Sequence, residues 1–180
     1  MIMAKKNAKD AKNALSTTTT CFARVPTPIG MLVLVGDHDG SRLALRGIYF
    51  DGAPHATNAV PPGAREDAAA FAGVCDQLEA YFDGKRRSFD LALAPLGTDF
   101  QLEVWKALAA IPYGTTTTYA EIARAIGKPR AVRAVGAANG KNPLSIVVPC
   151  HRVIGKDGTL TGYAGGLPSK RKLLAIESAS

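Results

Sequence analysis

The arrangement of apolar and polar residues predicts a β-hairpin early in the chain. Residues 31–36 and 43–50 are rich in apolar and β-branched residues, and Asp37-His38-Asp39-Gly40 between them has the composition of a tight turn. Residues 51–65 contain several prolines and glycines and are expected to form a loop. Residues 88–93 alternate between polar and apolar side chains, which predicts a short strand.

Helices are expected in the remaining segments. Thr98 with Gln101, and Thr118 with Glu121, have the spacing of capping boxes that open helices. Gly127 is suited to end the second of these helices. Because two short helices then flank a tight turn, they form a helix-turn-helix pattern. The predicted helices are residues 66–82, 98–110, 118–126, 129–139 and 168–178.

These elements predict an α/β protein of the α+β type with two domains. Pro95-Leu96-Gly97 is the expected boundary between them. We expect residues 1–20 to be a disordered basic tail, because lysines, alanines and threonines offer little to bury. We expect residues 21–95 to form a small domain of sheet and helix. Residues 96–180 are then a mostly helical C-terminal domain that contains the helix-turn-helix.

The positive charge of the chain is concentrated in its C-terminal half. Residues 1–100 hold 11 Lys/Arg against 11 Asp/Glu, a balance of zero. Residues 101–180 hold 11 Lys/Arg against 4 Asp/Glu, and 11 − 4 accounts for the whole net charge of +7. This excess indicates a surface that faces a polyanion such as nucleic acid, although an ordinary solvated basic face has the same composition.

The three cysteines, Cys21, Cys75 and Cys150, are widely spaced and favour a reducing compartment over a disulfide framework. His38 and His55 could join the first two at a metal, but the tight ligand pairs of structural zinc sites are missing, which favours core cysteines and surface histidines. No apolar run approaches the ~20 residues of a membrane span, and the lysine-rich start lacks the apolar core of a secretory signal. We therefore expect a soluble, cytoplasmic protein of bacterial type that has no membrane partner.

The helix expected over residues 129–139 is rich in Ala and Gly and has few side chains that read base edges. A slim helix of this kind could approach the minor groove of a duplex. Arg133 stands in the middle of this small-residue surface and could fill the space of an extruded base. The spacing alone favours an arginine that contacts phosphate or an acidic side chain. Further phosphate contacts are expected from Arg124, Lys128, Arg130 and Lys141.

Cys150 is the candidate nucleophile. It follows the apolar residues 145–149 and directly precedes His151 and Arg152. A lone cysteine in an apolar segment is usually inert core, but nearby positive charge lowers a thiol pKa and favours the thiolate. Because successive side chains of an extended segment point opposite ways, we expect His151 to reach the thiol through one water. Glu177 could orient His151 as the third member of a relay, or be an exposed residue near a helix end.

The same residues carry a resemblance to a known family. The chain resembles the methylated-DNA–protein-cysteine methyltransferases, also called O-6-alkylguanine-DNA alkyltransferases, over about residues 96–177. Residues 21–95 match only loosely, and residues 1–20 match nothing. The matching motifs are Phe100-Gln101, Val104-Trp105, Arg133-Ala134-Val135-Gly136, Asn142-Pro143, Pro149-Cys150-His151-Arg152-Val153 and Gly162-Tyr163-Ala164-Gly165-Gly166-Leu167.

The resemblance implies roles in the reaction. Cys150 would accept the alkyl group, and His151 would act through water as its base, oriented by Glu177. Asn142 would brace the turn that carries the site. Tyr119 would help to rotate the nucleotide and donate a proton to the departing guanine. A thiolate is suited to in-line displacement at a saturated carbon, and the thioether product is stable. The implied activity is irreversible, single-turnover repair of O-6-alkylguanine, and less well of 4-O-alkylthymine, without metal or organic cofactor.

The resemblance also implies contacts with double-stranded DNA, bound by a monomer. Arg133 would occupy the vacated stack, while Tyr163 and the backbone of Val153 would contact the flipped base. Ala164 departs from the serine of some family members, so one hydrogen bond to the base is absent. The minor-groove helix would also contribute Ala134, Gly136 and Arg130.

Three other functions fit parts of this pattern. A Cys-His hydrolase usually has its histidine far from the cysteine in sequence, whereas His151 adjoins Cys150. A lesion sensor of the same family would replace the acceptor cysteine, which is present here. A helix-turn-helix transcription regulator would need more base-reading side chains than the small-residue helix offers.

Overall fold

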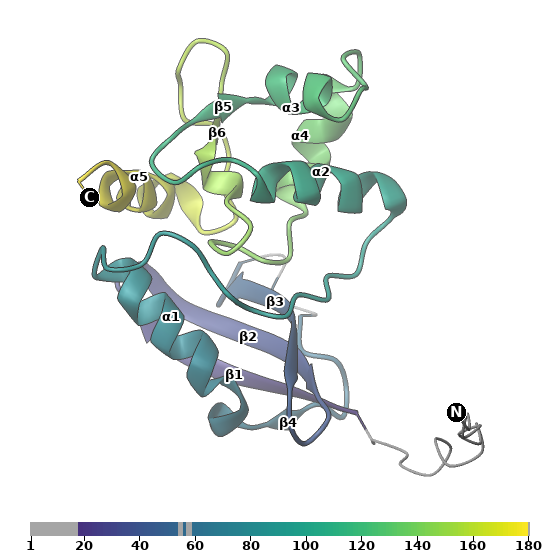
Figure 1. Cartoon of the computed structure of the whole chain (residues 1–180), viewed down its shortest axis with the longest axis vertical. Coiled ribbons are helices and arrows are strands. Elements are labelled where there is room, and N and C mark those ends of the chain that lie inside the picture. The colour runs from purple at the N-terminus through teal and green to yellow at the C-terminus, as the bar shows by residue number, and fades with distance from the viewer. Residues whose placement is uncertain (1–17, 54–55, 57–58, 180) are drawn as a thin grey trace, which may run out of the picture.

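The computed structural model describes residues 18–53, 56 and 59–179, and it has an N-terminal half built on a sheet and a mostly helical C-terminal half (Figure 1). The α+β prediction is confirmed. The tail expected over residues 1–20 lies largely outside the described residues. Its predicted end is too late, because a strand begins at Thr19 and the Thr20 hydroxyl donates to the Asp37 carboxylate at 2.7 Å.

The N-terminal sheet has the order β3-β2-β1-β4. The predicted hairpin is confirmed as the antiparallel pair β2 and β3. Strand β1 was not predicted, although its buried Cys21 and Ala23 alternate with more exposed residues as expected for a strand with one face on the core. The strands are β1 (Thr19–Thr27), β2 (Gly30–His38), β3 (Leu43–Phe50) and β4 (Arg65–Glu66).

One face of this sheet is covered by helix α1 (Ala72–Phe82), which follows the short 3₁₀ helix η1 (Ala68–Phe71) (Figure 1). The helix starts later than the predicted residue 66, because β4 takes that residue and the Asp67 side chain caps η1 by accepting from the Ala70 amide. The predicted apolar stripe is buried at Phe71, Val74, Leu78 and Tyr81.

The strand predicted over residues 88–93 is wrong. Within this segment only Leu93 forms a β-bridge, and its partner is Leu45 of β3. In this bridge the Leu45 amide donates to the Ala92 carbonyl, and the Ala94 amide donates to the Leu45 carbonyl. Three residues before Leu93, the backbone of Asp90 is bound by the side chain of Gln77. The Gln77 Nε2 donates to the Asp90 carbonyl and its Oε1 accepts from the Asp90 amide, both at 2.8 Å. Because a side chain satisfies this backbone, the alternating segment joins the sheet at one residue only.

The C-terminal half contains four α-helices and a two-stranded parallel sheet. Both predicted capping boxes are present, at Thr98 and at Thr118. No helix in the part of the chain that the structure describes is long and apolar enough to span a membrane. The elements are α2 (Asp99–Ala109), β5 (Thr117–Thr118), α3 (Tyr119–Ala125), α4 (Val132–Gly140), η2 (Cys150–Arg152), β6 (Val153–Ile154) and α5 (Gly166–Ser178).

Helices α3 and α4 form the predicted helix-turn-helix. Gly127 ends the first helix with a φ of 70°, a left-handed conformation that favours glycine. Helix α4 begins at Val132 instead of the predicted Pro129, because Lys128 to Ala131 form a separate turn in which the Ala131 amide donates to the Lys128 carbonyl at 2.8 Å.

The two halves are joined along the edge strand β3. The Ile48 amide donates to the Pro143 carbonyl at 2.7 Å, and the Ser145 amide donates back to Ile48 at 3.3 Å. The Phe50 ring packs edge-on against Tyr163, with ring centroids 5.5 Å apart. The sheet edge therefore supports the segment that leads to Cys150.

Substitution Thr118→Ala should lower the free energy of unfolding by about 1 kcal/mol, because an N-cap hydroxyl is lost from α3. The measurement is urea unfolding followed by fluorescence of Trp105, the single tryptophan, whose indole donates to the Ala138 carbonyl. The exposed Thr116 is the matched control, and Thr116→Ala should change stability by less than about 0.5 kcal/mol. Equal losses in both variants would contradict the capping role.

Candidate active site

Cys150 lies in the short turn η2 and is 4% exposed. The preceding segment is braced by Asn142, whose side-chain amide donates to the Val148 carbonyl at 2.8 Å and whose oxygen accepts from the Leu144 amide at 3.0 Å. Within this segment Ile146 has a φ of 75°, which is rare for a β-branched residue. The bonds of Asn142 and the pairing with β3 hold this strained backbone in place.

The neighbour of Cys150 belongs to a buried charged cluster. His151 is completely buried, and its Nε2 lies 2.9 Å from Oε1 of Glu177. Arg152 donates to the same carboxylate through Nε and Nη2, both at 2.8 Å, and through Nη1 to the Ile111 carbonyl. The Gly114 amide donates to Oε2 at 3.2 Å. Glu177, 3% exposed, is therefore a central acceptor of the site and not an exposed residue at a helix end.

The pKa values of this cluster follow from burial and from these bonds. Burial raises the pKa of Glu177, but donation from His151 and Arg152 outweighs it and holds the pKa of the carboxyl well below its ordinary value of 4.5. Burial lowers the pKa of His151 against the opposing effect of Glu177, so the imidazole is neutral at physiological pH. A neutral imidazole has a nitrogen that can accept a proton.

The expected lowering of the Cys150 pKa by its neighbours is wrong for this structure. Burial raises the pKa of the thiol, while the Asn142 side chain and the charge of Lys170 oppose this effect. Arg152, which the sequence places two residues away, directs its guanidinium to Glu177 instead. The resting thiol is therefore neutral and needs a base to react.

The backbone at Cys150 also differs from the expected extended segment, because it forms a 3₁₀ turn. Nδ1 of His151 is buried and has no hydrogen-bond partner among the described residues. Because Nε2 is held by Glu177, Nδ1 is the nitrogen left to serve another group.

A hollow of about 420 Å³ lies between the helix-turn-helix and the loop after β6. The Tyr119 hydroxyl is 2.8 Å from that of Thr161, which ties the start of α3 to this loop. The Tyr163 ring lies edge-on to the His151 ring, with centroids 6.3 Å apart, so this wall reaches toward the Cys150 region. The hollow is lined by Tyr119, Gly136, Asn139, Gly140, Gly162, Tyr163 and Ala164.

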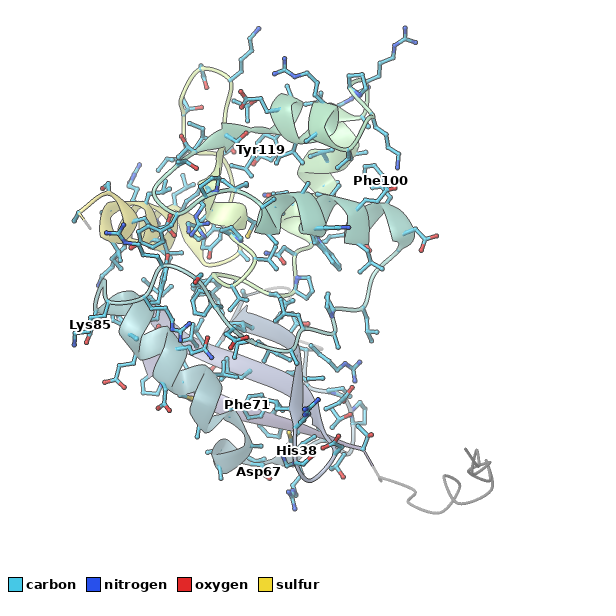
Figure 2. The ribbon with its side chains drawn as sticks, viewed as in Figure 1. His38, Asp67, Phe71, Lys85, Phe100 and Tyr119 are labelled. Carbon is cyan, nitrogen blue, oxygen red and sulfur yellow. The ribbon has the colours of Figure 1, made fainter. Side chains whose placement is uncertain are left out.

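The predicted DNA contacts on the helix-turn-helix lie apart from the buried cluster, whereas Tyr163 and Val153 adjoin it. Arg133 and Ala134 are exposed on α4, and Arg130 is exposed in the turn before it. Gly136 lies on the side of α4 that faces Tyr119. Val153 is buried in β6. Figure 2 shows Tyr119 in the same part of the molecule as the exposed cationic side chains of the helix-turn-helix.

Sequence reasoning missed the role of Lys170. Its side chain is fully buried, and Nζ donates to the carbonyls of Val153 and Thr161 at 2.7 and 3.0 Å. A signal was available, because Lys170, Leu173 and Glu177 share one face of α5 at helical spacing. Charged residues on the apolar stripe of a helix indicate buried, paired groups.

The described residues include no group of three or more side chains suited to hold a metal ion. Cys21 donates to the Gly36 carbonyl, and His38 accepts from the Gly40 amide at the end of the sheet distant from Tyr119 (Figure 2). His55, the other residue considered for a metal site, lies outside the described part of the chain.

The fold and the site define a class of protein: a helix-turn-helix protein whose buried cysteine adjoins a His-Glu pair. Two family models match. The 6-O-methylguanine DNA methyltransferase ribonuclease-like domain matches residues 21–95, and the DNA binding domain of the same name matches residues 99–179.

Relatives with known names agree. The methylated-DNA–protein-cysteine methyltransferase of Methanosarcina barkeri is 53% identical over 85% of this chain and 94% of its own length. The methylated-DNA–protein-cysteine methyltransferase of Mycobacterium tuberculosis is 50% identical over 88% of this chain and 92% of its own length. A crystal structure of Mycobacterium tuberculosis OGT in complex with DNA matches with a TM-score of 0.79 at 47% identity, over 88% of this chain and 92% of that one. The chain belongs to the 6-O-methylguanine DNA methyltransferase family.

Acid should destabilise the protein partly through Glu177. Its pKa is lowered on folding, so its contribution to stability is fully present above about pH 4.5 and is lost as the pH falls toward the lower folded value. Glu177→Gln should cost about 3–5 kcal/mol at neutral pH, because Arg152 stays buried without a counter-charge. Urea unfolding between about pH 7 and pH 3 should also give a flatter pH dependence for the variant than for wild type.

The matched control for this experiment is Asp157→Asn, which removes an exposed carboxylate whose pKa is also lowered. This variant should keep most of the stability at neutral pH. A Glu177→Gln variant with wild-type stability and the same acid dependence would contradict the buried ion pair.

Proposed function

We propose that this chain repairs alkylated DNA by transferring an alkyl group from the O6 position of guanine to the sulfur of Cys150. The observation that carries the proposal is the buried thiol beside His151, whose Nε2 is held by Glu177 while Nδ1 has no partner among the described residues. The names of the relatives and the DNA in the Mycobacterium tuberculosis structure support it.

In the proposed step the sulfur–carbon bond forms as the bond between carbon and O6 breaks. The thiol proton passes through one water to Nδ1 of His151, which Glu177 orients. The electron pair leaves with the guanine, and Tyr119 donates a proton to the departing base. The thioether on Cys150 is stable to water and thiols, so each molecule acts once and needs no cofactor. Asn142 keeps the turn in the geometry for this step.

The reaction requires the base to leave the duplex, and the surface around the hollow is suited to receive it. Tyr163 and the backbone of Val153 would contact the flipped base, and Tyr119 would help to rotate the nucleotide. Ala164 offers no hydroxyl for a further hydrogen bond. The same pocket would accept 4-O-alkylthymine less well. Unstacking costs a few kcal/mol and costs least for bases that pair poorly, which favours damaged bases.

A monomer would bind double-stranded DNA through α4 in the minor groove. The exposed Ala134 and the half-buried Gly136 are small enough to allow close approach, Arg133 would fill the vacated stack, and Arg130 would contact phosphate. The division into a tail, an N-terminal domain and a C-terminal DNA-binding domain also stays a proposal, supported by the two family models. The free cysteines support a cytoplasmic location.

The proposal is tested by intact-protein mass spectrometry after incubation with a duplex that carries one O-6-methylguanine. Wild type should gain one methyl group, about 14 Da, in a stoichiometric reaction. Cys150→Ser should show no gain, and the control Cys75→Ser, which changes a cysteine of the N-terminal half, should gain as wild type does. A wild-type protein that binds the lesion without gaining mass is a sensor, and this result would overturn the proposal.

Arg133→Ala should slow repair in duplex DNA more than reaction with the free base, because its proposed role is to stabilise the extruded state. Single-turnover rates on both substrates measure the difference. Arg130→Ala, which removes an exposed cation from the preceding turn, is the matched control and should weaken duplex binding with a salt-dependent loss. Equal losses of Arg133→Ala on the duplex and the free base would remove the extrusion role.

A further inference from the structure

The carboxylate of Glu177 accepts a hydrogen bond from the N-terminal half of the molecule. The Tyr81 hydroxyl donates to Oε1 at 2.7 Å across 96 positions of sequence. Tyr81 lies on α1, the helix that covers the N-terminal sheet, and its side chain is fully buried. No element of the C-terminal half supplies this donor.

This bond ends on the oxygen that also contacts His151. Oε1 accepts from Tyr81, from His151 and from Nη2 of Arg152, whereas Oε2 accepts from Nε of Arg152 and from the Gly114 amide. Donation from a neutral hydroxyl withdraws electron density from Oε1 without adding charge. Tyr81 therefore affects how strongly Oε1 accepts the hydrogen bond from Nε2 of His151, and through it the pKa of the imidazole.

The hydroxyl of Tyr81 is separable from the packing of its ring. The ring packs against Phe82, Phe89 and Tyr113, with centroids 5.4 to 6.2 Å apart, and these contacts do not use the oxygen. A phenylalanine at this position keeps the contacts and the helix. The hydroxyl thus donates to Glu177, and removing it would leave the ring contacts of the core unchanged.

We propose that Tyr81 is a positioning residue of the transfer reaction, through which the N-terminal half sets the orientation of Glu177 and the basicity of His151. The effect on the rate of alkyl transfer rests on the proposed function, whereas the effect on the pKa of His151 does not. Tyr81 does not touch the substrate; it acts through Glu177.

The sign of the effect follows from the groups around the pair. His151 and Glu177 are faced by Tyr81 from α1, Arg152 from η2, Lys170 from α5, and the rings of Tyr113 and Tyr163. In Tyr81→Phe the cations Arg152 and Lys170 stay, while Oε1 loses a donor and becomes a stronger acceptor. The imidazolium form of His151 is then better stabilised, and its pKa rises.

The first measurement needs no DNA. Long-range ¹H–¹⁵N NMR resolves the imidazoles of the three histidines, and His151→Asn identifies the signal of His151. Tyr81→Phe should raise the pKa of His151 by ~0.5 unit or more and move the Nε2 resonance. Tyr49→Phe is the matched control, because Tyr49 is a tyrosine of the N-terminal sheet outside the cluster, and it should leave the titration unchanged.

The second measurement is the single-turnover rate of transfer to Cys150 as a function of pH. In Tyr81→Phe the acidic limb should move to higher pH, so that the ratio of the rates at about pH 8 and pH 6 increases about two- to fivefold. In a Glu177→Gln background the same substitution should add nothing, because its effect passes through the carboxylate.

A second change at position 81 covers the case in which Tyr81→Phe does not fold. Site-specific 3-fluorotyrosine at position 81 keeps the ring and makes the hydroxyl a stronger donor, so the pKa of His151 should fall. If neither change moves the His151 titration, Tyr81 only packs and the inference is overturned. If wild type transfers no alkyl group, the proposed function fails, while the titration still decides the role of Tyr81.

Discussion

The buried carboxylate of Glu177 is the constraint on which this structure depends. An isolated charge with 1% side-chain exposure would be very costly, and here it is offset by Arg152, His151, Tyr81 and the Gly114 amide. These four donors come from three segments, η2, α1 and the loop at Gly114, so satisfying one carboxylate of α5 fixes their mutual positions. Gly114 shows how tight this junction is, because a Cβ at that position would lie 3.1 Å from the Glu177 carbonyl.

The second requirement is a rigid support for the segment before Cys150. Asn142 satisfies backbone groups inside that segment, and Ile48 of β3 pairs with it from outside. Together they hold Ile146 in a conformation that it would not adopt alone. The N-terminal half therefore supports the site at two points. The edge strand β3 pairs with the segment before Cys150, and Tyr81 of α1 donates to Glu177.

Burial sets the resting protonation states of Cys150 and His151. Burial raises the pKa of the Cys150 thiol and lowers that of His151, so both groups rest neutral. A neutral thiol is a poor nucleophile toward adventitious electrophiles, and a neutral imidazole can take its proton when an alkyl group is aligned. Under the proposed function, in which Cys150 is consumed by its own reaction, this resting state would protect the acceptor.

The amino-acid sequence by itself determined the local features: the hairpin of β2 and β3, both capping boxes, the glycine stop at Gly127 and the helix-turn-helix. Each depends on residues within a few positions of one another. The single bridge at Leu93 depends on a distant partner, Leu45, so local patterns misjudged it. Strand β1 was missed although its partner β2 follows after only Pro28 and Ile29. Only the tertiary structure decided that Arg152 binds Glu177 instead of activating Cys150, and that Tyr81 reaches the same carboxylate. A buried charge must be paired with whichever donors lie beside it in space, and these donors are far from Glu177 in the sequence, so residue spacing does not predict them.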